Sequence, residues 1–187
     1  MALPRSSNVQ IIQSEGDRAT YSAAILLLAA SIPATPTDLF QLTCGDGSKV
    51  IRLSKFEVYA DATAAGTLSF YVIRRNVANT GGVLSPITPM KHDYIYNPTP
   101  AGIFGNYTTL PSVLGAGDLM RSAGVALPAA ASTGYPFTPL VWLFGQSNAQ
   151  MPTLRIPTSS FALNLAGQAV PPGLRLWVSC EWTEDVV

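Results

Sequence analysis

Residues 49–75 carry the sequence KVIRLSKFEVYADATAAGTLSFYVIRR, and this stretch decides the fold class. In its second half Leu68, Phe70 and Val72 alternate with polar or amphipathic side chains. Apolar residues at every second position are typical of a half-buried antiparallel strand. The first half is rich in β-branched and aromatic residues, and the small residues 62–66 between the halves favour a turn. We therefore predict two long strands joined as a hairpin, in an all-β protein.

The first half of this stretch changes the parity of its apolar residues. Ile51 and Leu53 lie on one parity, whereas Phe56 and Val58 lie on the other. One extra residue in the strand, a β-bulge, would turn all four side chains to the same face and bend the strand. We therefore predict a bulge near residues 54–55. Bent and twisted strands are typical of sandwiches and barrels rather than of flat sheets.

The composition describes a chain with little charge. Of its 187 residues 48% are hydrophobic and only 12% are charged, with eleven basic and eleven acidic side chains. A neutral chain without a basic block lacks the electrostatic features of a nucleic-acid-binding protein. It also lacks the net charge that keeps small proteins apart in solution. This composition favours a surface covered by neighbouring proteins, and a merely weakly charged β domain is the alternative.

Cysteine content and hydropathy restrict the cellular setting. Cys44 and Cys180 are too few for a disulfide scaffold in a chain of this length, so free buried thiols are favoured over a pair. The first residues do not have the pattern of a signal peptide. The apolar run Ala23–Ala30 is too short to span a bilayer. We expect a soluble protein, made in a cytoplasm, with no membrane partner.

The chain divides into an extended N-terminal arm, residues 1–20, and one domain, residues 21–187. Residues 21–31 suit either a helix or a buried strand, and the following prolines favour the strand. Turn residues separate roughly eight to ten expected strands, which is the pattern of an antiparallel β-sandwich or jelly roll. Besides the two opening strands we expect these: 38–44, 120–127, 139–144 as a central strand, 154–156 paired with 161–165, and 174–182.

Residues 76–111 are expected to form a long irregular loop that contains five prolines and four aromatic residues. Loops of this length rarely lack a role in a compact domain. Proline rigidity combined with projecting aromatic side chains is typical of a contact surface. The aromatic residues are Tyr94, Tyr96, Phe104 and Tyr107.

No residue pattern points to catalysis, a metal or a cofactor. His92 is the only histidine, and no nucleophile motif or zinc-ligand spacing accompanies it. The acidic residues Glu181, Glu184 and Asp185 are expected to solubilise an exposed terminus rather than to form a glycosidase pair. We therefore expect a protein that is not an enzyme and has no cofactor.

Two further features bear on contacts with other chains. Arg74 and Arg75 end a strand, either solvated or in a salt bridge to a neighbouring subunit. Trp177 lies on the polar parity of a strand whose other face is apolar. Either both faces of that strand are buried, or Trp177 belongs to an interface, where tryptophan is enriched.

The order of several short segments resembles a known family. The segments are KVIRLSKFEV at 49–58, TAAGTLSFYVIRRN at 63–76, ANTGG at 78–82, KHD at 91–93, PLVWLFG at 139–145, FALNLAG at 161–167 and EWTE at 181–184. In this order they are similar to small virion structural proteins of tailed bacteriophages and prophages, over about residues 20–185. No segment is catalytic, and the arm lies outside the similarity.

The resemblance implies a β-sandwich on the surface of a virion assembled in the host cytoplasm. Small phage jelly rolls commonly act as capsid decoration (cement) proteins, so it implies a homotrimer that binds the major capsid protein and stabilises the mature head. The arm and the loop Tyr94–Tyr107 are the expected contact elements. The candidate interface residues are Arg5, Val9, Ile11, Ile12, Arg18, Arg74, Arg75, Tyr94, Tyr96, Phe104, Tyr107 and Trp177.

Two other functions remain as alternatives. One is a tail fibre or baseplate module that recognises a host-surface glycan through Tyr94, Tyr96 and Tyr107, although no heptad repeat of a fibre shaft occurs. The other is a capsule-degrading enzyme, which would need hydrolysis that depends on Glu181 or Glu184. Copy number per virion would separate decoration, with hundreds of copies, from a tail module, with a handful.

Overall fold

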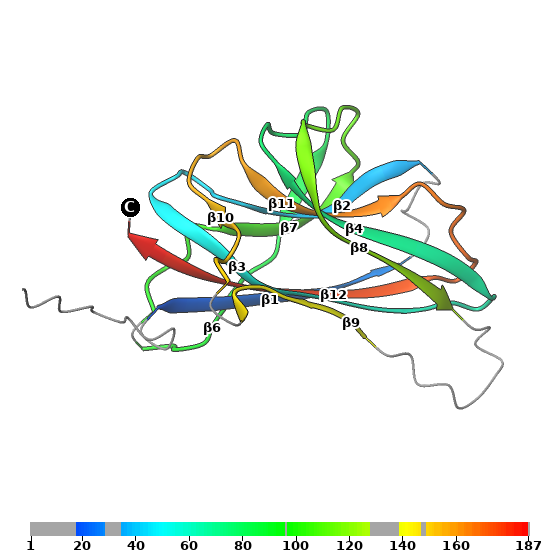
Figure 1. Cartoon of the computed structure of the whole chain (residues 1–187), viewed down its shortest axis with the longest axis horizontal. Helices are drawn as coiled ribbons and strands as arrows, with labels where there is room; N and C mark the ends of the chain where they lie inside the picture. The colour runs from blue at the N-terminus through cyan, green and yellow to red at the C-terminus, as the bar shows by residue number, and fades with distance from the viewer. Residues whose placement is uncertain (1–17, 29–34, 96, 128–138, 147–148, 187) are drawn as a thin grey trace, which may run out of the picture.

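Every strand in the described part of the chain belongs to one of two antiparallel sheets. The computed structural model describes residues 18–28, 35–95, 97–127, 139–146 and 149–186. The sheets lie one above the other as the two layers of a β-sandwich (Figure 1). The prediction of an all-β sandwich is therefore confirmed.

Sheet A is the lower layer in Figure 1. It consists of β1 (Ala19–Leu28), β3 (Lys49–Asp61), β6 (Met90–Lys91), β9 (Leu140–Leu143), β10 (Thr153–Leu154) and β12 (Arg175–Val186). The strand order is β10–β3–β12–β1–β6, with β9 paired to a different part of β3. The last strand of the chain, β12, therefore occupies the centre of this sheet.

Sheet B is the upper layer. It consists of β2 (Pro36–Thr43), β4 (Gly66–Arg75), β5 (Val83–Pro86), β7 (Ile103–Thr109), β8 (Gly117–Leu127) and β11 (Ser160–Ala166). The strand order is β5–β7–β2–β11–β4–β8. Its two middle strands, β2 and β11, are buried on both faces for nearly their whole length. Other segments of the chain therefore cover the outer face of sheet B at its centre.

The opening stretch forms two strands, as predicted, but the predicted hairpin is wrong. β3 belongs to sheet A and β4 to sheet B, so the turn between them connects the two layers. No two consecutive strands in the described chain pair with each other. Alternation of apolar residues shows which face of a strand is buried, and both strands do bury one face, but it carries no information about the neighbouring strand.

The predicted bulge in β3 is confirmed. Glu181 of β12 pairs with Lys55 and the next residue, Trp182, pairs with Leu53, so Ser54 is the extra residue. The apolar residues on both sides of the bulge point inward, and all four are fully buried: Ile51, Leu53, Phe56 and Val58. Bending at Ser54 therefore allows one long strand to follow the core on both sides of the bend.

Several strand predictions hold and others need correction. β1 is a strand, as favoured over a helix, and it begins at Ala19; residues 1–17 of the predicted arm lie outside the described residues. The segment predicted as irregular, 76–111, contains β5, β6 and β7. β9 was expected to be central but lies at an edge of sheet A, and Val141 and Leu143 are exposed. β10 and β11 lie in different sheets rather than forming a pair.

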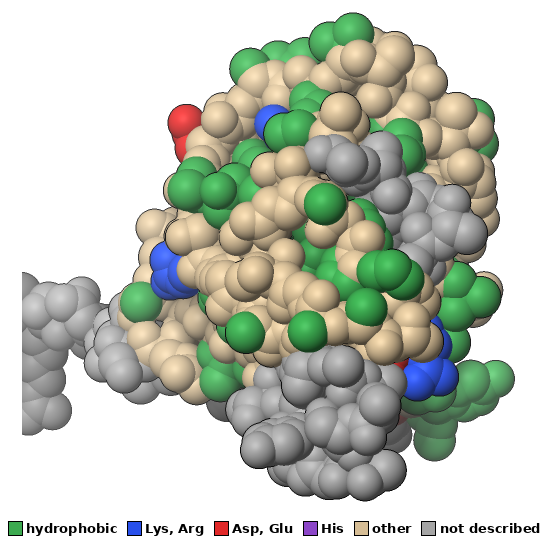
Figure 2. Space-filling view, turned by 90° about the vertical axis from the view of Figure 1, so that its right-hand side faces the viewer, with side chains coloured by type: hydrophobic (Ala, Val, Ile, Leu, Met, Phe, Trp, Pro, Cys, Tyr) green, Lys and Arg blue, Asp and Glu red, His purple; other side chains and the backbone are tan. Residues whose placement is uncertain are grey.

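The core lies between the sheets and is built mostly from large aromatic and aliphatic side chains. Its largest fully buried residues are Trp182, Tyr21, Phe40, Phe56, Phe70, Phe104 and Phe161. Cys44 and Cys180 are buried in the same core as free thiols, as expected. The described surface at one end of the molecule shows hydrophobic side chains scattered among uncharged polar ones and backbone, with few charged side chains (Figure 2), in keeping with the composition.

Candidate interaction surfaces

The structure distributes the candidate interface residues over several places. Arg5, Val9, Ile11, Ile12 and Tyr96 lie outside the described residues. Of the others, Arg18 and Tyr94 lie at one end of sheet A, and Trp177 lies on the outer face of that sheet. Phe104, Tyr107 and Arg75 are buried in or against sheet B, and Arg74 is exposed on β4.

The loop that follows β6 is pinned to the first strand of the chain. The Thr20 carbonyl oxygen accepts hydrogen bonds from the His92 backbone N–H at 3.0 Å and from Asn97 Nδ2 at 2.9 Å. Lys91 Nζ donates to the Asn97 carbonyl at 3.0 Å, and the Tyr21 hydroxyl donates to the Pro98 carbonyl at 2.8 Å. Residues 91–98 are therefore held at both ends against the start of β1.

A buried carboxylate fixes the next part of the same loop. Glu184, only 4% exposed, accepts hydrogen bonds from the backbone N–H groups of Ala101 and Gly102 at 2.9 Å each and from Trp182 Nε1 at 3.0 Å. Its neighbour Asp185 forms ion pairs with Arg18 and Arg52. The expectation that these acidic residues solubilise an exposed terminus is wrong, because their carboxylates bind specific donors.

Glu181, the third acidic residue of that group, is also paired. Its carboxylate lies 3.2 Å from Lys55 Nζ on the neighbouring strand, and Lys55 is also 2.8 Å from Glu57. These two carboxylates raise the pKa of Lys55, the contact with Glu57 contributing most. The lysine therefore stays charged between its two partners.

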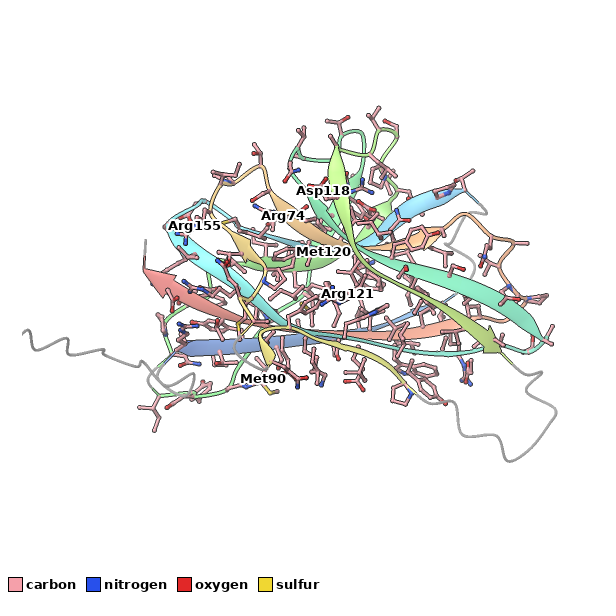
Figure 3. The ribbon with its side chains drawn as sticks, viewed as in Figure 1. Arg74, Met90, Asp118, Met120, Arg121 and Arg155 are labelled. Carbon is pink, nitrogen blue, oxygen red and sulfur yellow. The ribbon has the colours of Figure 1, made fainter. Side chains whose placement is uncertain are left out.

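The tip of the pinned loop projects apolar side chains into solvent. Tyr94 is 87% exposed and Ile95 is 81% exposed. Met90, at the start of the loop, is 72% exposed and lies on the outer side of sheet A (Figure 3). Large apolar side chains this exposed, on a loop fixed by five or more hydrogen bonds, are typical of a docking element.

Cationic side chains lie beside the base of this loop. Arg18 Nε lies 3.6 Å from Asp185, which also pairs with Arg52. Burial, followed by the positive charges of Arg18 and Arg155, lowers the pKa of Arg52. Two guanidinium groups thus pair with the Asp185 carboxylate, and the charge of Arg155 acts on Arg52 beside them. Arg155 is exposed, at the upper left in Figure 3.

Phe104 and Tyr107 are not interface residues, and the prediction for them is wrong. Both belong to β7, where Phe104 is fully buried and stacks on Phe40 with a 6.1 Å centroid distance. Tyr107 is 8% exposed and donates its hydroxyl proton to Gln41. Only Tyr94 among the described aromatic residues of this segment is available to a partner.

Arg75 is neither solvated nor available to a neighbouring subunit, which corrects both readings of its position. Its Nε and Nη2 atoms donate to the two oxygens of Asp38, at 2.9 and 2.7 Å, and Nη1 donates to the Gly115 carbonyl at 2.8 Å. Asn79 Nδ2 and Asn164 Nδ2 complete the shell of Asp38 at 2.8 and 2.7 Å. Asp38 is fully buried with four donors around it.

This polar cluster explains what covers sheet B. Asn79 and Gly115 belong to the connections before β5 and before β8, and the Gly115 N–H donates to Asn79 Oδ1 at 2.8 Å. Their contacts with Asp38 and Arg75 hold both connections onto the outer face of the sheet. Arg74, one residue away, is exposed opposite Asp118 of β8 (Figure 3). The Asp38 cluster is therefore structural.

Trp177 lies in a row of side chains across the outer face of sheet A. The pairing registers place Leu26, Trp177 and Tyr59 side by side on β1, β12 and β3. Trp177 contacts the Tyr59 ring edge-on at a 5.0 Å centroid distance, and the Arg175 guanidinium lies 5.2 Å from the Trp177 ring centroid. Arg175 is held in turn by an ion pair with Asp61.

The next row completes a groove on the same face. Ala24, Ser179 and Glu57 lie side by side there, and together with the Trp177 row they line a depression of about 390 Å³. Ser179 Oγ lies 3.5 Å from Glu57 Oε2. This groove combines aromatic walls with a carboxylate and a hydroxyl. From the sequence only Trp177 indicated it, through its position on the polar parity.

A second depression, of about 410 Å³, lies where the edges of the two sheets face each other. The residues that line it are Met120, Arg121, Leu143, Phe144, Gly145, Gln146, Ala149, Gln150 and Pro152. The Arg121 guanidinium lies 5.3 Å from the Phe144 ring centroid. This stacked arginine leaves little apolar surface open in the depression.

The described residues contain no group of three or more histidine, cysteine or acidic side chains arranged to hold a metal ion. Within the same residues, no helix is long and apolar enough to cross a membrane. Comparison of the chain with protein-family models, with curated proteins and with solved structures gave no match.

Proposed function

We propose that this chain is a structural protein of a bacteriophage particle, most simply a decoration protein that docks on the capsid shell as a homotrimer. The observation that carries the proposal is the pinned loop 91–102 with its exposed apolar tip. The resemblance in segment order supports the viral setting. The proposed partners are further copies of this chain and the major capsid protein.

The loop suits docking because its conformation is fixed before a partner arrives. Binding costs free energy when a loop must be ordered, and preorganised loops avoid most of that cost. Hydrogen bonds from His92, Asn97, Ala101 and Gly102 hold the loop at both ends. Tyr94 and Ile95 at the tip can therefore enter a pocket on a partner with little loss of freedom.

The surroundings of the tip match the usual arrangement of an interface. An apolar centre with a polar or charged rim is common in protein–protein contacts. The tip provides the apolar centre, and Arg18 and Arg52, paired with Asp185, provide charged groups beside the base of the loop. The proposed shell surface would then carry an apolar pocket with charged residues beside it.

Binding to shells tests the proposal directly. Purified shells that lack this protein are incubated with the full chain and sedimented, and bound protein is measured against concentration. Wild-type chain is expected to saturate at a fixed ratio to the shell subunit. The variant Tyr94→Ser/Ile95→Ser should bind at least about tenfold more weakly, as expected for a central contact.

A matched control separates the tip from apolar exposure in general. Val113, in the connection before β8, and Leu119, on β8, are 60% and 58% exposed, away from the loop. Val113→Ser/Leu119→Ser should bind shells like the wild type. Equal weakening by both double variants, or no binding of the wild-type chain to shells, would contradict the proposal.

A host-recognition module of the tail is the second candidate function. The groove beside Trp177 favours it, because the groove presents an aromatic side chain with polar groups next to it. The residues first considered for this role support it less, since Tyr107 is buried. Quantitative mass spectrometry of virions distinguishes the candidates, with hundreds of copies for decoration and a handful for a tail module.

A further inference from the structure

The outer face of sheet A carries a feature that docking through loop 91–102 does not use. Its groove is formed by side chains of three adjacent strands, β1, β12 and β3. Because strands are rigid elements in register, the positions of these side chains are fixed relative to one another. The volume, about 390 Å³, falls in the range of small-molecule sites.

Trp177 forms a preorganised aromatic wall of this groove. Arg175 lies over the ring at 5.2 Å and is itself paired with Asp61, while Tyr59 packs edge-on at 5.0 Å. These contacts restrain the indole without burying it, since Trp177 remains partly exposed and lines the groove. An indole restrained in this way offers a flat, electron-rich surface.

Beside this wall lies a short array of polar groups. Glu57 Oε2 lies 3.5 Å from Ser179 Oγ and 2.8 Å from Lys55 Nζ. The array therefore combines a carboxylate acceptor, an ammonium donor and a hydroxyl that does both. Neighbouring hydroxyl groups of a sugar each donate and accept hydrogen bonds, so this combination complements a vicinal diol.

We infer that this groove is a binding site for a neutral pyranose saccharide. The apolar C–H face of the sugar ring lies against Trp177, where the negative face of the indole attracts weakly positive hydrogens. The sugar hydroxyls bond to Glu57 and Ser179 in the groove, and Lys55 holds the Glu57 carboxylate from beside it. An acidic sugar is disfavoured, because Glu57 and Glu181 together outweigh the charge of Lys55.

A protein partner suits this face less well than a sugar. The centres of protein interfaces are depleted of charged residues. A protein that covered the face would remove the charges of Lys55, Glu57 and Glu181 from water. The free energy lost by desolvating these charges exceeds the attraction within the ion pairs unless the pair geometry is excellent. A saccharide instead replaces the water molecules around these groups with its own hydroxyls.

The experiment uses the full chain and four neutral probes: maltose, cellobiose, lactose and N,N′-diacetylchitobiose. Tryptophan fluorescence is a selective readout, because Trp142 and Trp182 are only 8% and 0% exposed while Trp177 lines the groove. We expect at least one probe to change the fluorescence saturably with a millimolar Kd. N-acetylneuraminic acid, the acidic control, should bind at least about tenfold more weakly than that probe.

Two variants then assign the binding to the groove. The indole N–H signals of the ¹⁵N-labelled chain, recorded by NMR during the titration, show which tryptophan the sugar contacts. Glu57→Gln removes the charged acceptor and should weaken binding at least about tenfold, as expected for a lost hydrogen bond to a charged group. Trp177→Ala removes the wall and should abolish binding, which isothermal titration calorimetry measures for this variant because it lacks the reporting indole. Arg74→Ala, exposed on the other sheet, should bind like the wild type.

The inference is overturned if none of the four probes shifts the Trp177 indole signal up to about 50 mM, well above the millimolar range. It is also overturned if binding survives both Glu57→Gln and Trp177→Ala, or if the acidic sugar binds as tightly as the neutral ones. Because the assay contains no shells, its failure leaves the decoration proposal standing, and the shell assay can fail without affecting the saccharide site.

Discussion

Arg75 and Asp38 form a buried, bidentate ion pair across β11, with N–O distances of 2.9 and 2.7 Å. The two residues are 37 positions apart in the chain and lie on β4 and β2. Asn164 of β11, between these strands, donates to the same carboxylate at 2.7 Å. The pair therefore joins the three central strands of sheet B on the side away from the core.

Removing one partner of this pair should strongly destabilise the fold. Arg75→Met leaves the Asp38 carboxylate buried without its main counter-charge, and breaking a buried pair in this way costs about 3–5 kcal/mol of unfolding free energy. Arg74→Met, at the exposed neighbour, should stay within about 0.5 kcal/mol of the wild type. Urea unfolding followed by tryptophan fluorescence measures both, and equal costs would show that the pair contributes no more than a surface arginine.

Deleting Ser54 should abolish the fold, whereas replacing it should not. Without the extra residue, Ile51 and Leu53 would turn to the outer face and Arg52 to the core, a change worth at least about 4 kcal/mol. Ser54→Ala should be neutral or slightly stabilising, because Ser54 Oγ is buried with no hydrogen-bond partner among the described residues. Circular dichroism and urea unfolding of both variants check this; a stably folded deletion variant would contradict the role given to the bulge.

Stability should fall in alkaline solution through Tyr21. Burial, and then the negative charge of Glu184, raise the pKa of the Tyr21 hydroxyl to about 12. The pKa of tyrosine in an unfolded chain is about 10, so the folded state holds this proton more tightly. The stabilising contribution is complete below about pH 10 and is lost as the pH rises toward about 12.

The variant Tyr21→Phe isolates this effect. It should lose the hydrogen bond to the Pro98 carbonyl at every pH, and its unfolding free energy should fall less steeply than that of the wild type above about pH 10. Tyr94→Phe, which removes an exposed hydroxyl, is the control and should follow the wild-type curve. Parallel curves for Tyr21→Phe and the wild type would rule out Tyr21 as the source of the alkaline loss.

Both thiols should be unreactive until the protein unfolds. Burial, and secondarily the charge of Glu181, raise the pKa of Cys180 well above its usual value; burial followed by Asp46 and Glu184 raises that of Cys44. A thiol reacts as its thiolate, so both changes slow modification in addition to blocking access. Titration with a thiol-specific chromophore should detect neither cysteine in native buffer and both in urea. Rapid native labelling, assigned with Cys44→Ser, would identify an opening of the core.

The sequence predicts well what depends on the two faces of a strand. β1, β3, β4 and β12 each bury one parity of side chains, and the parity change in β3 locates the bulge to within one residue. These features follow from local periodicity. The identity of neighbouring strands does not, because every pairing in the described chain joins segments separated by at least one other strand.

The candidate site was harder to predict than the fold, for two physical reasons. β7 escaped notice because Gly105 interrupts its apolar pattern; a Cβ there would lie 2.5 Å from the Ser85 carbonyl oxygen. Arg75 and Glu184 resembled solvated charges because their partners, Asp38 and residues 101–102, are distant in sequence. Tyr94, in contrast, projects from a proline-rich loop as expected.

The position of β12 has a consequence for how the protein is made. This strand supplies the middle of sheet A, between β3 and β1, and it follows both of them in the chain. Until β12 leaves the ribosome, β1 and β3 have no backbone partner between them. A nascent chain that lacks β12 therefore cannot assemble sheet A or present the surfaces of that sheet to an assembly.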